Sequence, residues 1–394
     1  MSSRTEARLR SPLYPGASLL GDAEAEAVAR VMESRNLFRY YGFTQPNEVE
    51  AYEQAWAEHA GVRHALALNS GTSALFCSLV AAGVRPGDEV IIPAFGWISV
   101  PNTVVQVGAI PVVVDVDESL TIDIREVEQA LGERTAAILA VHMRGAPCAM
   151  RELVALADSA GIPLIEDACQ AAGATYDGRP IGSFGRVAAF STQFAKLIST
   201  GEGGVMVTDD LVCYEAALDA HDPANALRRG AELTDYPGMN LRCTEIEAAI
   251  GRVQLGRLSE ALELLRAHAR RIAETVAGVG GFALRRRNDP VGDTGVSVIF
   301  FAPSAAMARE TRERLRAAGI GATCLYEHGV PDLHVAAYWK PAHAALSALG
   351  RTPPTCDTSY DLLGRAVQID VHPLFGHDDV DTICAAVEEA GRLL

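Results

Sequence analysis

Short apolar runs alternate with segments of helical periodicity between residues 64 and 208, and this rhythm constrains the fold more than any other feature. Such a strand–helix alternation builds a mostly parallel sheet with helices on its faces. The runs are continuous rather than alternating in polarity, as expected for strands buried on both faces. Helices are predicted between them, for example at Ser73–Ala82 and Met150–Ala160. The predicted strands are His64–Leu68, Val90–Pro93, Pro111–Val116, Ala136–Val141, Pro163–Ile165, Val187–Phe190 and Val205–Val207.

A smaller second domain is predicted for the C-terminal third. The chain has 394 residues, which is too long for one compact core. A long helix is predicted from the capping signature Thr244–Glu247 to about residue 276, leading from one domain into the other. Beyond it, the apolar run Val296–Phe301 and the helical segments Ala306–Ala318 and Val380–Leu393 indicate an α+β domain. We therefore predict an α/β fold with two domains, residues 1–265 and 266–394.

Charge and composition exclude several classes of function. A net charge of −16 argues against nucleic acid as a partner, because a phosphate backbone requires a basic footprint. No apolar run reaches the roughly 20 residues that cross a bilayer, so no membrane association is expected. The first residues lack the apolar stretch of a secretory signal, which favours a cytoplasmic protein. The cysteines form no CxxC pair, so no metal site is predicted.

A lysine stands in an unusual setting at position 196. Lys196 follows the predicted strand Val187–Phe190 and precedes a turn that contains Gly201, Gly203 and Gly204. Glycines permit tight turns and close approach of the backbone to a ligand. A lysine in an enclosed site can lose its proton and act as an amine nucleophile that forms a Schiff base. The alternative is a solvated surface lysine.

An anion site is predicted at Asn69–Ala74, which follows a strand and begins a helix. Unpaired N–H groups and the positive end of the helix would face a phosphate there. Ser70 and Thr72 add hydroxyl donors. The segment matches neither a Walker A loop nor a GxGxxG loop, which disfavours ATP and NAD. The alternative is a simple helix N-cap.

Two further side chains follow strands. Asp167 ends a buried apolar run, where a carboxylate is costly without a cationic partner such as a protonated pyridine nitrogen. Its alternatives are an N-cap or a core ion pair. Trp97 follows another strand and could stack on a flat ring, or it could simply be part of the core. A phosphate site, a stacking aromatic, a buried acid and an amine, each at the carboxyl end of a strand, together indicate pyridoxal phosphate.

The sequence resembles the DegT/StrS sugar aminotransferase family of fold-type-I pyridoxal-phosphate enzymes from Gly42 onward. This resemblance implies a homodimer with shared active sites and a reaction between a small-molecule amino donor and a keto acceptor. The segments that carry it are NSGTSAL, PGDEVIIPAFGW, IPVVVDVD, VHMRGAPCAM, IEDACQAAGATYDGRPIGSFG, FSTQFAKLISTGEGG and GMNLRCTEIEAAIGRVQL.

The resemblance assigns a role to each matching residue. Lys196 would bind the cofactor covalently and shuttle a proton, and Asp167 would hold the pyridine nitrogen. Gln170 would contact the ring hydroxyl and Trp97 the ring face. Asn240 would reach the phosphate of the neighbouring subunit. The remaining phosphate ligands would be Ser70, Gly71, Thr72 and Ser191.

Two departures from the family pattern affect the expected substrate. Many relatives carry histidine where this chain has Ala172. Gln193, before the lysine, resembles the cyclitol and aminohydroxybenzoate branches more than the nucleotide-sugar form. The expected reaction moves an amino group from L-glutamate or L-glutamine to a keto-sugar or keto-cyclitol. The alternatives are a dehydratase or aromatising synthase on the same scaffold, and a non-catalytic regulator.

Residues that contact the substrate are harder to assign from the sequence. Arg39 and Arg242 could face the site from either subunit, and Tyr326 and His328 could close over it from the small domain. For each of them, a packed or solvated surface role is an equal alternative.

Overall fold

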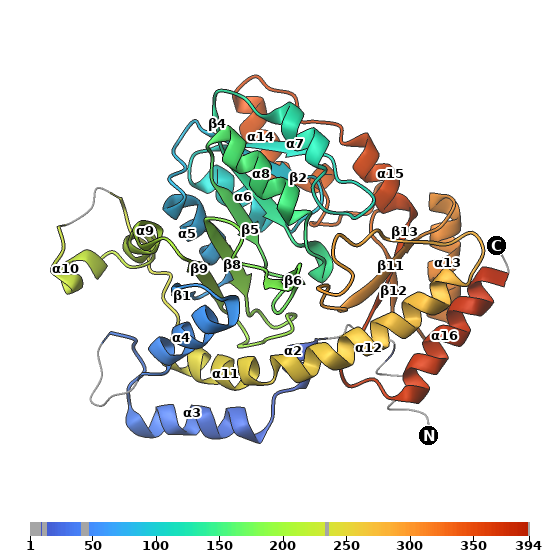
Figure 1. Ribbon diagram of the computed structural model, residues 1–394, viewed down its shortest axis with the longest axis horizontal. Helices are drawn as coiled ribbons and strands as arrows, with labels where there is room; N and C mark the ends of the chain where they lie inside the picture. The colour runs from blue at the N-terminus through green and yellow to red at the C-terminus, as the bar shows by residue number, and fades with distance from the viewer. Residues whose placement is uncertain (1–8, 10–13, 41–46, 233–235, 393–394) are drawn as a thin grey trace.

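The central element of the computed structural model is a seven-stranded sheet with the order β1-β9-β8-β5-β4-β2-β3 (Figure 1). The structure describes residues 9, 14–40, 47–232 and 236–392, so Gly42, where the resemblance was expected to begin, lies outside the described residues. Only β9 runs against its neighbours, which confirms the mostly parallel sheet. The strands are β1 His64–Leu68, β2 Glu89–Pro93, β3 Ile110–Val114, β4 Thr135–Val141, β5 Leu164–Asp167, β8 Val187–Ser191 and β9 Gly204–Thr208.

Both faces of this sheet are buried, because residues along each strand contribute alternately to two apolar cores. In β1, for example, Leu66 and Leu68 pack on one side and Ala65 and Ala67 on the other. The first side is covered by α5 Gly71–Ala81, α6 Ser99–Gln106 and α9 Leu211–His221. The second side is covered by α4 Glu48–Ala60, α7 Ile124–Ala130, α8 Met150–Ala160 and the start of α12.

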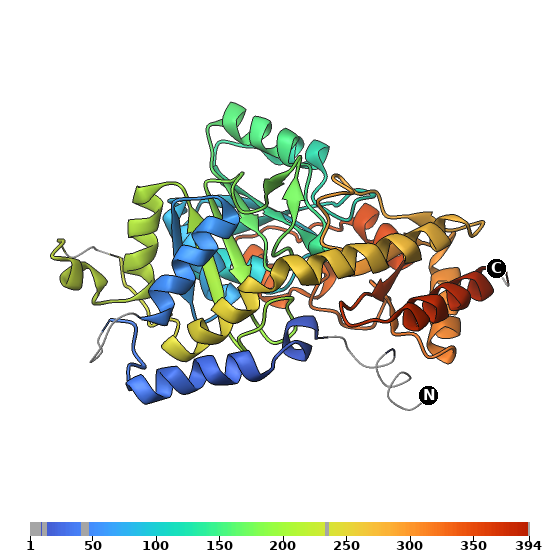
Figure 2. The same ribbon diagram turned by 60° about the horizontal axis from the view of Figure 1, so that its bottom comes forward.

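The long helix predicted from residue 244 is two helices, so that prediction was wrong in its continuity. The helices α11 Glu245–Gly256 and α12 Leu258–Ala277 meet at Arg257, and the predicted capping box at Thr244 and Glu247 is present. Gly256 disfavours helix at the junction, and Arg257 is held by Glu24 and by the carbonyl oxygen of Leu19. Helix α3 Asp22–Ser34, which carries Glu24, packs along α11 (Figure 2).

The C-terminal part forms an antiparallel sheet with the order β10-β11-β13-β12, covered by helices. This agrees with the predicted α+β character. The predicted domain boundary at residue 265 falls inside α12, and the division at that residue stays a prediction. No helix within the described ranges is long and apolar enough to cross a membrane. The elements are β10 Ala283–Leu284, β11 Ser297–Phe301, α13 Ala305–Ala317, β12 Ala322–Cys324, η2 Ala336–Tyr338, α14 Lys340–Ala348, α15 Asp357–Arg365, β13 Ala366–Asp370 and α16 His377–Arg392.

Short elements complete the fold. They are α2 Pro15–Ser18, η1 Met143–Gly145, β6 Thr175–Tyr176, β7 Arg179–Pro180 and α10 Asn225–Arg229. Of these, α2 and η1 matter most, because both lie against the edge of the sheet where the parallel strands end.

Candidate active site

The predicted cofactor residues gather at one edge of the main sheet. Ser191 and Asp167 are the last residues of β8 and β5, Gly71 follows β1, and Trp97 follows β2. These strands run in the same direction, so their carboxyl ends share an edge, which is where ligands bind in open α/β sheets. The strand order places these four residues in sequence across that edge.

The N-terminus of α5 forms the predicted anion site. Ser70 is its N-cap, and its hydroxyl oxygen accepts a hydrogen bond from the N–H of Ser73 at 3.0 Å. The predicted helix N-cap is therefore present, and it satisfies only one of the N–H groups of the first turn. Gly71 lies so close to β8 that an added Cβ would be 2.6 Å from Cβ of Ser191. Thr72 is exposed.

Lys196 is partly buried in the loop between β8 and β9. Its N–H donates to the carbonyl oxygen of Gln193 at 2.8 Å, and its own carbonyl oxygen accepts from the N–H of Gly16 at 3.0 Å. A Cβ at Gly16 would lie 2.7 Å from that oxygen, so α2 is packed directly on the lysine loop. Burial lowers the pKa of the Lys196 amine, and the charge of Arg144 lowers it further against the opposing effect of Cys169 and Asp167.

Asp167 is 4% exposed, and burial raises the pKa of its carboxyl group. One carboxylate oxygen accepts a hydrogen bond from the N–H of Cys169 at 3.0 Å, and no ion pair joins Asp167 to any described residue. The adjacent acid, Glu166, has a structural role, because it accepts from Gly182, Phe184 and Gly185 and contacts His142. Asp167 is thus the carboxylate of this pair that still needs a cation.

The predicted ring-binding positions lie on the same sheet edge as Asp167. The side-chain oxygen of Gln170 accepts from the N–H of Arg144 at 3.1 Å. Trp97 is 41% exposed, and its ring centroid lies 4.7 Å from that of His334. Nδ1 of His334 contacts Asp332 at 2.8 Å. Burial is the main cause that lowers the pKa of His334.

Sequence reasoning missed Arg144, Asp332, His334 and Gly16. Arg144 lies in the turn after β4 within a quoted motif, so its position after a strand was a usable signal. Asp332 and His334 lie outside any helix or strand, where no pattern marks them.

The substrate-contact predictions are placed as follows. Arg39 pairs with Glu53 at 2.5 Å, with both side chains 9% exposed, and Arg242 pairs with Asp222 at 3.2 Å. The ring of Tyr326 stacks on that of Tyr360 at 5.3 Å. His328 is exposed, as is Asn240. The structure thus gives both arginines a carboxylate partner inside the chain, and a role for any of these residues toward substrate stays a prediction.

These residues fit pyridoxal 5'-phosphate. A phosphate suits the first turn of α5, and the buried carboxylate of Asp167 suits a protonated pyridine nitrogen. The exposed face of Trp97 suits a flat ring, and the amine of Lys196 with its lowered pKa suits an aldehyde. Among the described residues, no cluster of His, Cys, Asp and Glu side chains could hold a metal ion.

Comparisons with known proteins agree with this arrangement. A GDP-perosamine synthase from Caulobacter vibrioides is 42% identical over 214 residues, which is 54% of this chain and 57% of that protein. A 3-amino-5-hydroxybenzoate synthase from Amycolatopsis mediterranei is 36% identical over 254 residues, which is 64% of each chain. The matched part of the chain therefore spans less than two thirds of the length of these relatives.

Structural similarity extends over nearly the whole chain. The structure of an aminotransferase from Psychrobacter cryohalolentis superposes with a TM-score of 0.83 at 28% identity, covering 94% of this chain and 96% of that one. The expected α/β fold-type-I architecture is thereby confirmed, and pyridoxal phosphate is the cofactor that goes with it. The sequence matches the family description over residues 20–388, and the chain belongs to the DegT/DnrJ/EryC1/StrS aminotransferase family.

Proposed function

We propose that this protein is a pyridoxal-phosphate-dependent aminotransferase that moves an amino group from L-glutamate or L-glutamine to a keto-sugar or keto-cyclitol. The observation that carries the proposal is the partly buried amine of Lys196, whose pKa burial lowers, on the same sheet edge as Asp167 and the N-terminus of α5. The sequence contains only one other lysine, Lys340, which is exposed at the start of α14. Lys196 is therefore the only lysine suited to bind the cofactor at this edge.

Each residue of the candidate site would have a separate role toward the cofactor or the substrate. The first turn of α5 binds the phosphate, and Trp97 covers one face of the ring. Asp167 would hold the protonated pyridine nitrogen, and the cofactor, when bound, would supply an electron-accepting ring. Nζ of Lys196 would take the proton from the substrate carbon that bears nitrogen and deliver it to the cofactor, and would move it in the opposite direction in the second half-reaction. This role requires an amine that is neutral near neutral pH.

Replacing each lysine tests the covalent assignment. Lys196→Ala should lose the visible absorbance band of bound cofactor and amino transfer, whereas Lys340→Ala should keep both. Borohydride reduction followed by peptide mapping should place the cofactor on Lys196. A label on Lys340, or turnover that survives in Lys196→Ala, would disprove the proposal.

Aromatising synthase activity is a second candidate, because a 3-amino-5-hydroxybenzoate synthase is among the relatives. Incubation with amino donors separates the two activities: an aminotransferase converts its cofactor to pyridoxamine phosphate, and a protein without this half-reaction fits the synthase. The dehydratases of the family carry histidine in place of the lysine, so Lys196 counts against that activity. A non-catalytic regulator would be colourless and would gain no visible band with added cofactor.

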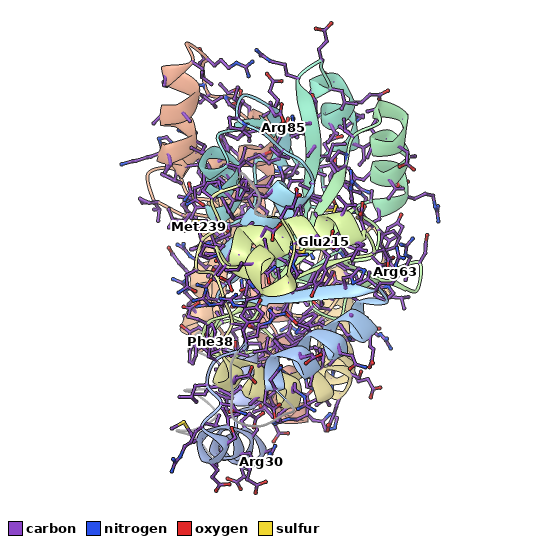
Figure 3. All side chains as sticks on the ribbon, turned by 90° about the vertical axis from the view of Figure 1, so that its left-hand side faces the viewer. Arg30, Phe38, Arg63, Arg85, Glu215 and Met239 are labelled. Carbon is purple, nitrogen blue, oxygen red and sulfur yellow. The ribbon has the colours of Figure 1, made fainter. Side chains whose placement is uncertain are left out.

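We also propose a cytoplasmic homodimer with shared active sites. Exposed apolar side chains favour such an interface, among them Met239 next to Asn240, 41% exposed, and Leu227 in α10, 71% exposed. Figure 3 shows Met239 and Phe38 on the face that also presents α9. Mixing Lys196→Ala with Asn240→Ala subunits tests the sharing, because one site of each mixed dimer is then intact. Activity that does not recover on mixing refutes a contribution of Asn240 across the interface.

A further inference from the structure

Arg144 lies at the active-site edge and belongs to none of the contacts described for the cofactor. It is in η1, directly after β4, and β4 lies between β5, which ends at Asp167, and β2, which precedes Trp97. Neighbouring strands are about 4.8 Å apart. Arg144 is therefore one strand from each of these residues. It is four strands, or roughly 19 Å, from β1 and the start of α5, which makes the cofactor phosphate an unsuitable partner.

The guanidinium of Arg144 has no paired partner of its own. Its Nε is buried without a hydrogen bond, and no ion pair joins Arg144 to any residue within the described ranges. Other arginines near the main sheet, such as Arg39, are paired with a carboxylate. Asp332 and Asp370 act on Arg144 only through longer-range charge, and burial lowers the pKa of the guanidinium. A half-buried guanidinium whose buried Nε has no hydrogen bond is costly, so a ligand that supplies an anion would stabilise it.

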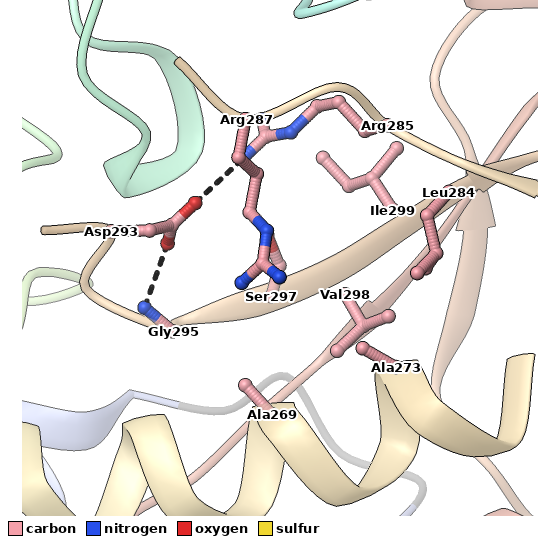
Figure 4. A pocket seen from close by; sticks show the side chains of 10 residues that line it. All are labelled: Ala269, Ala273, Leu284, Arg285, Arg287, Asp293, Gly295, Ser297, Val298 and Ile299. Atoms are coloured by element: carbon pink, nitrogen blue, oxygen red, sulfur yellow. Dashed lines mark hydrogen bonds and ion pairs between the residues drawn. The ribbon is translucent and has the colours of Figure 1, made fainter. Parts of the chain in front are cut away.

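The backbone at Arg144 is held in an unfavourable conformation by contacts from the C-terminal part. Arg144 has φ 56° and ψ 36°, which is the left-handed region that favours glycine. The guanidinium of Arg285 donates to the carbonyl oxygen of Met143 at 3.2 Å, and the N–H of Thr294 donates to that of Gly145 at 3.1 Å. Arg285 is itself fixed by Asp293, as Figure 4 shows. The charge of Arg144 acts on Lys196 and His334, so its guanidinium lies within electrostatic reach of the candidate site. A strained backbone held by tertiary contacts is typical of functional sites.

We propose that Arg144 binds a carboxylate of the substrate, carried either by the amino donor or by the acceptor. A guanidinium presents a planar pair of N–H donors that matches a carboxylate. The proposal rests on the proposed function, because it places the substrate next to Lys196 and Trp97. It adds the chemical class of group that the substrate must carry at this position.

Calorimetric titration of the purified holoenzyme with unreactive carboxylates tests the proposal. Glutarate represents the donor and cyclohexanecarboxylate represents a ring-shaped acceptor, with glutaramide as the uncharged comparison. Arg144→Gln should weaken binding of at least one carboxylate about 30-fold or more, the lower end of what removing one partner of a buried charge pair costs. Arg287→Gln, a matched loss of an exposed arginine nearby, should leave binding unchanged.

The outcomes identify the source of the carboxylate or overturn the proposal. Weaker binding of glutarate by Arg144→Gln shows that the amino donor carries the carboxylate. Weaker binding of cyclohexanecarboxylate alone shows that the acceptor carries it. If Arg144→Gln does not fold, Arg144→Lys, which keeps the charge without the paired donors, should bind about tenfold more weakly than the native protein. Undiminished binding in a folded Arg144 variant overturns the proposal. A native protein that lacks the visible band yet binds glutarate through Arg144 refutes the function and supports the carboxylate site.

Discussion

Gly71 provides the sharpest test of the phosphate site, because the start of α5 lies directly against the Ser191 side chain at the end of β8. In Gly71→Ala the new Cβ would lie 2.6 Å from Cβ of Ser191 and 3.0 Å from Sγ of Cys169. Ordinary contacts between such atoms are about 3.5–4.0 Å. The start of α5 and the end of β8 must therefore separate by roughly 1 Å to reach that spacing. Overpacking of this kind costs about 1–3 kcal/mol of folding stability.

The same displacement should weaken cofactor binding. The phosphate depends on N–H groups in the first turn of α5, and a hydrogen bond to a charged group contributes about 1.5–3 kcal/mol. Misplacing one such donor predicts a loss of affinity for pyridoxal phosphate of roughly 10- to 100-fold. The loss should exceed what the reduced stability alone explains, because the apoprotein stays folded under the conditions of the titration.

Equilibrium titration of apoprotein with pyridoxal phosphate measures the affinity, and urea unfolding of the apoprotein measures the stability. Gly256→Ala is the matched control, since a Cβ at this helical position meets nothing within 4 Å. That control should be neutral or stabilised by up to about 1 kcal/mol. Native affinity and stability in Gly71→Ala would show that the phosphate does not lie between α5 and β8.

Two further predictions concern charges. Burial lowers the pKa of Lys196, so the rate at which apoprotein regains the cofactor band should reach half its maximum at a pH below the ordinary lysine pKa of 10.5. In Arg144→Gln that midpoint should move upward, because the charge of Arg144 lowers the same pKa. Stopped-flow absorbance across a buffer series measures both midpoints, and an unmoved midpoint contradicts the charge effect. Arg39→Ala should destabilise the protein by about 3–5 kcal/mol, because Glu53 is left buried without its ion-pair partner. Adding Glu53→Gln should recover part of this loss, as measured by urea unfolding. An Arg39→Ala variant of native stability would mean that the pair contributes little.

The main sheet was predictable because each of its strands is a continuous apolar run between turn signals. His64–Leu68 and Met150–Ala160 were predicted with the bounds that β1 and α8 have in the structure. The break at Arg257 was not predictable, because the apolar period continues across it. Its cause lies in α3, where Glu24 holds Arg257 from a distance in sequence that periodicity does not report.

The active site was predictable where a functional residue ends a strand or follows one within a few residues. Lys196, Asp167 and Gly71 satisfy that rule, and the structure brings their elements to one edge. His334 and Asp332 were not predictable in this way, because they lie in a segment without regular structure that tertiary contacts bring to Trp97. Arg39 was named as a substrate contact because the sequence does not show that Glu53 pairs with it.

The charges at the sheet edge explain why the cofactor should stabilise the fold apart from any covalent bond. Asp167 and Lys196 are both held in burial that opposes their charged forms, as the raised and lowered pKa values show. The phosphate of the cofactor complements the positive end of α5, and its protonated ring nitrogen complements the carboxylate of Asp167. Cofactor at 100 times its dissociation constant should add about 2.7 kcal/mol to the free energy of unfolding. Because these contacts do not need the amine, Lys196→Ala should keep part of that gain, and a complete loss would place the binding energy in the covalent link instead.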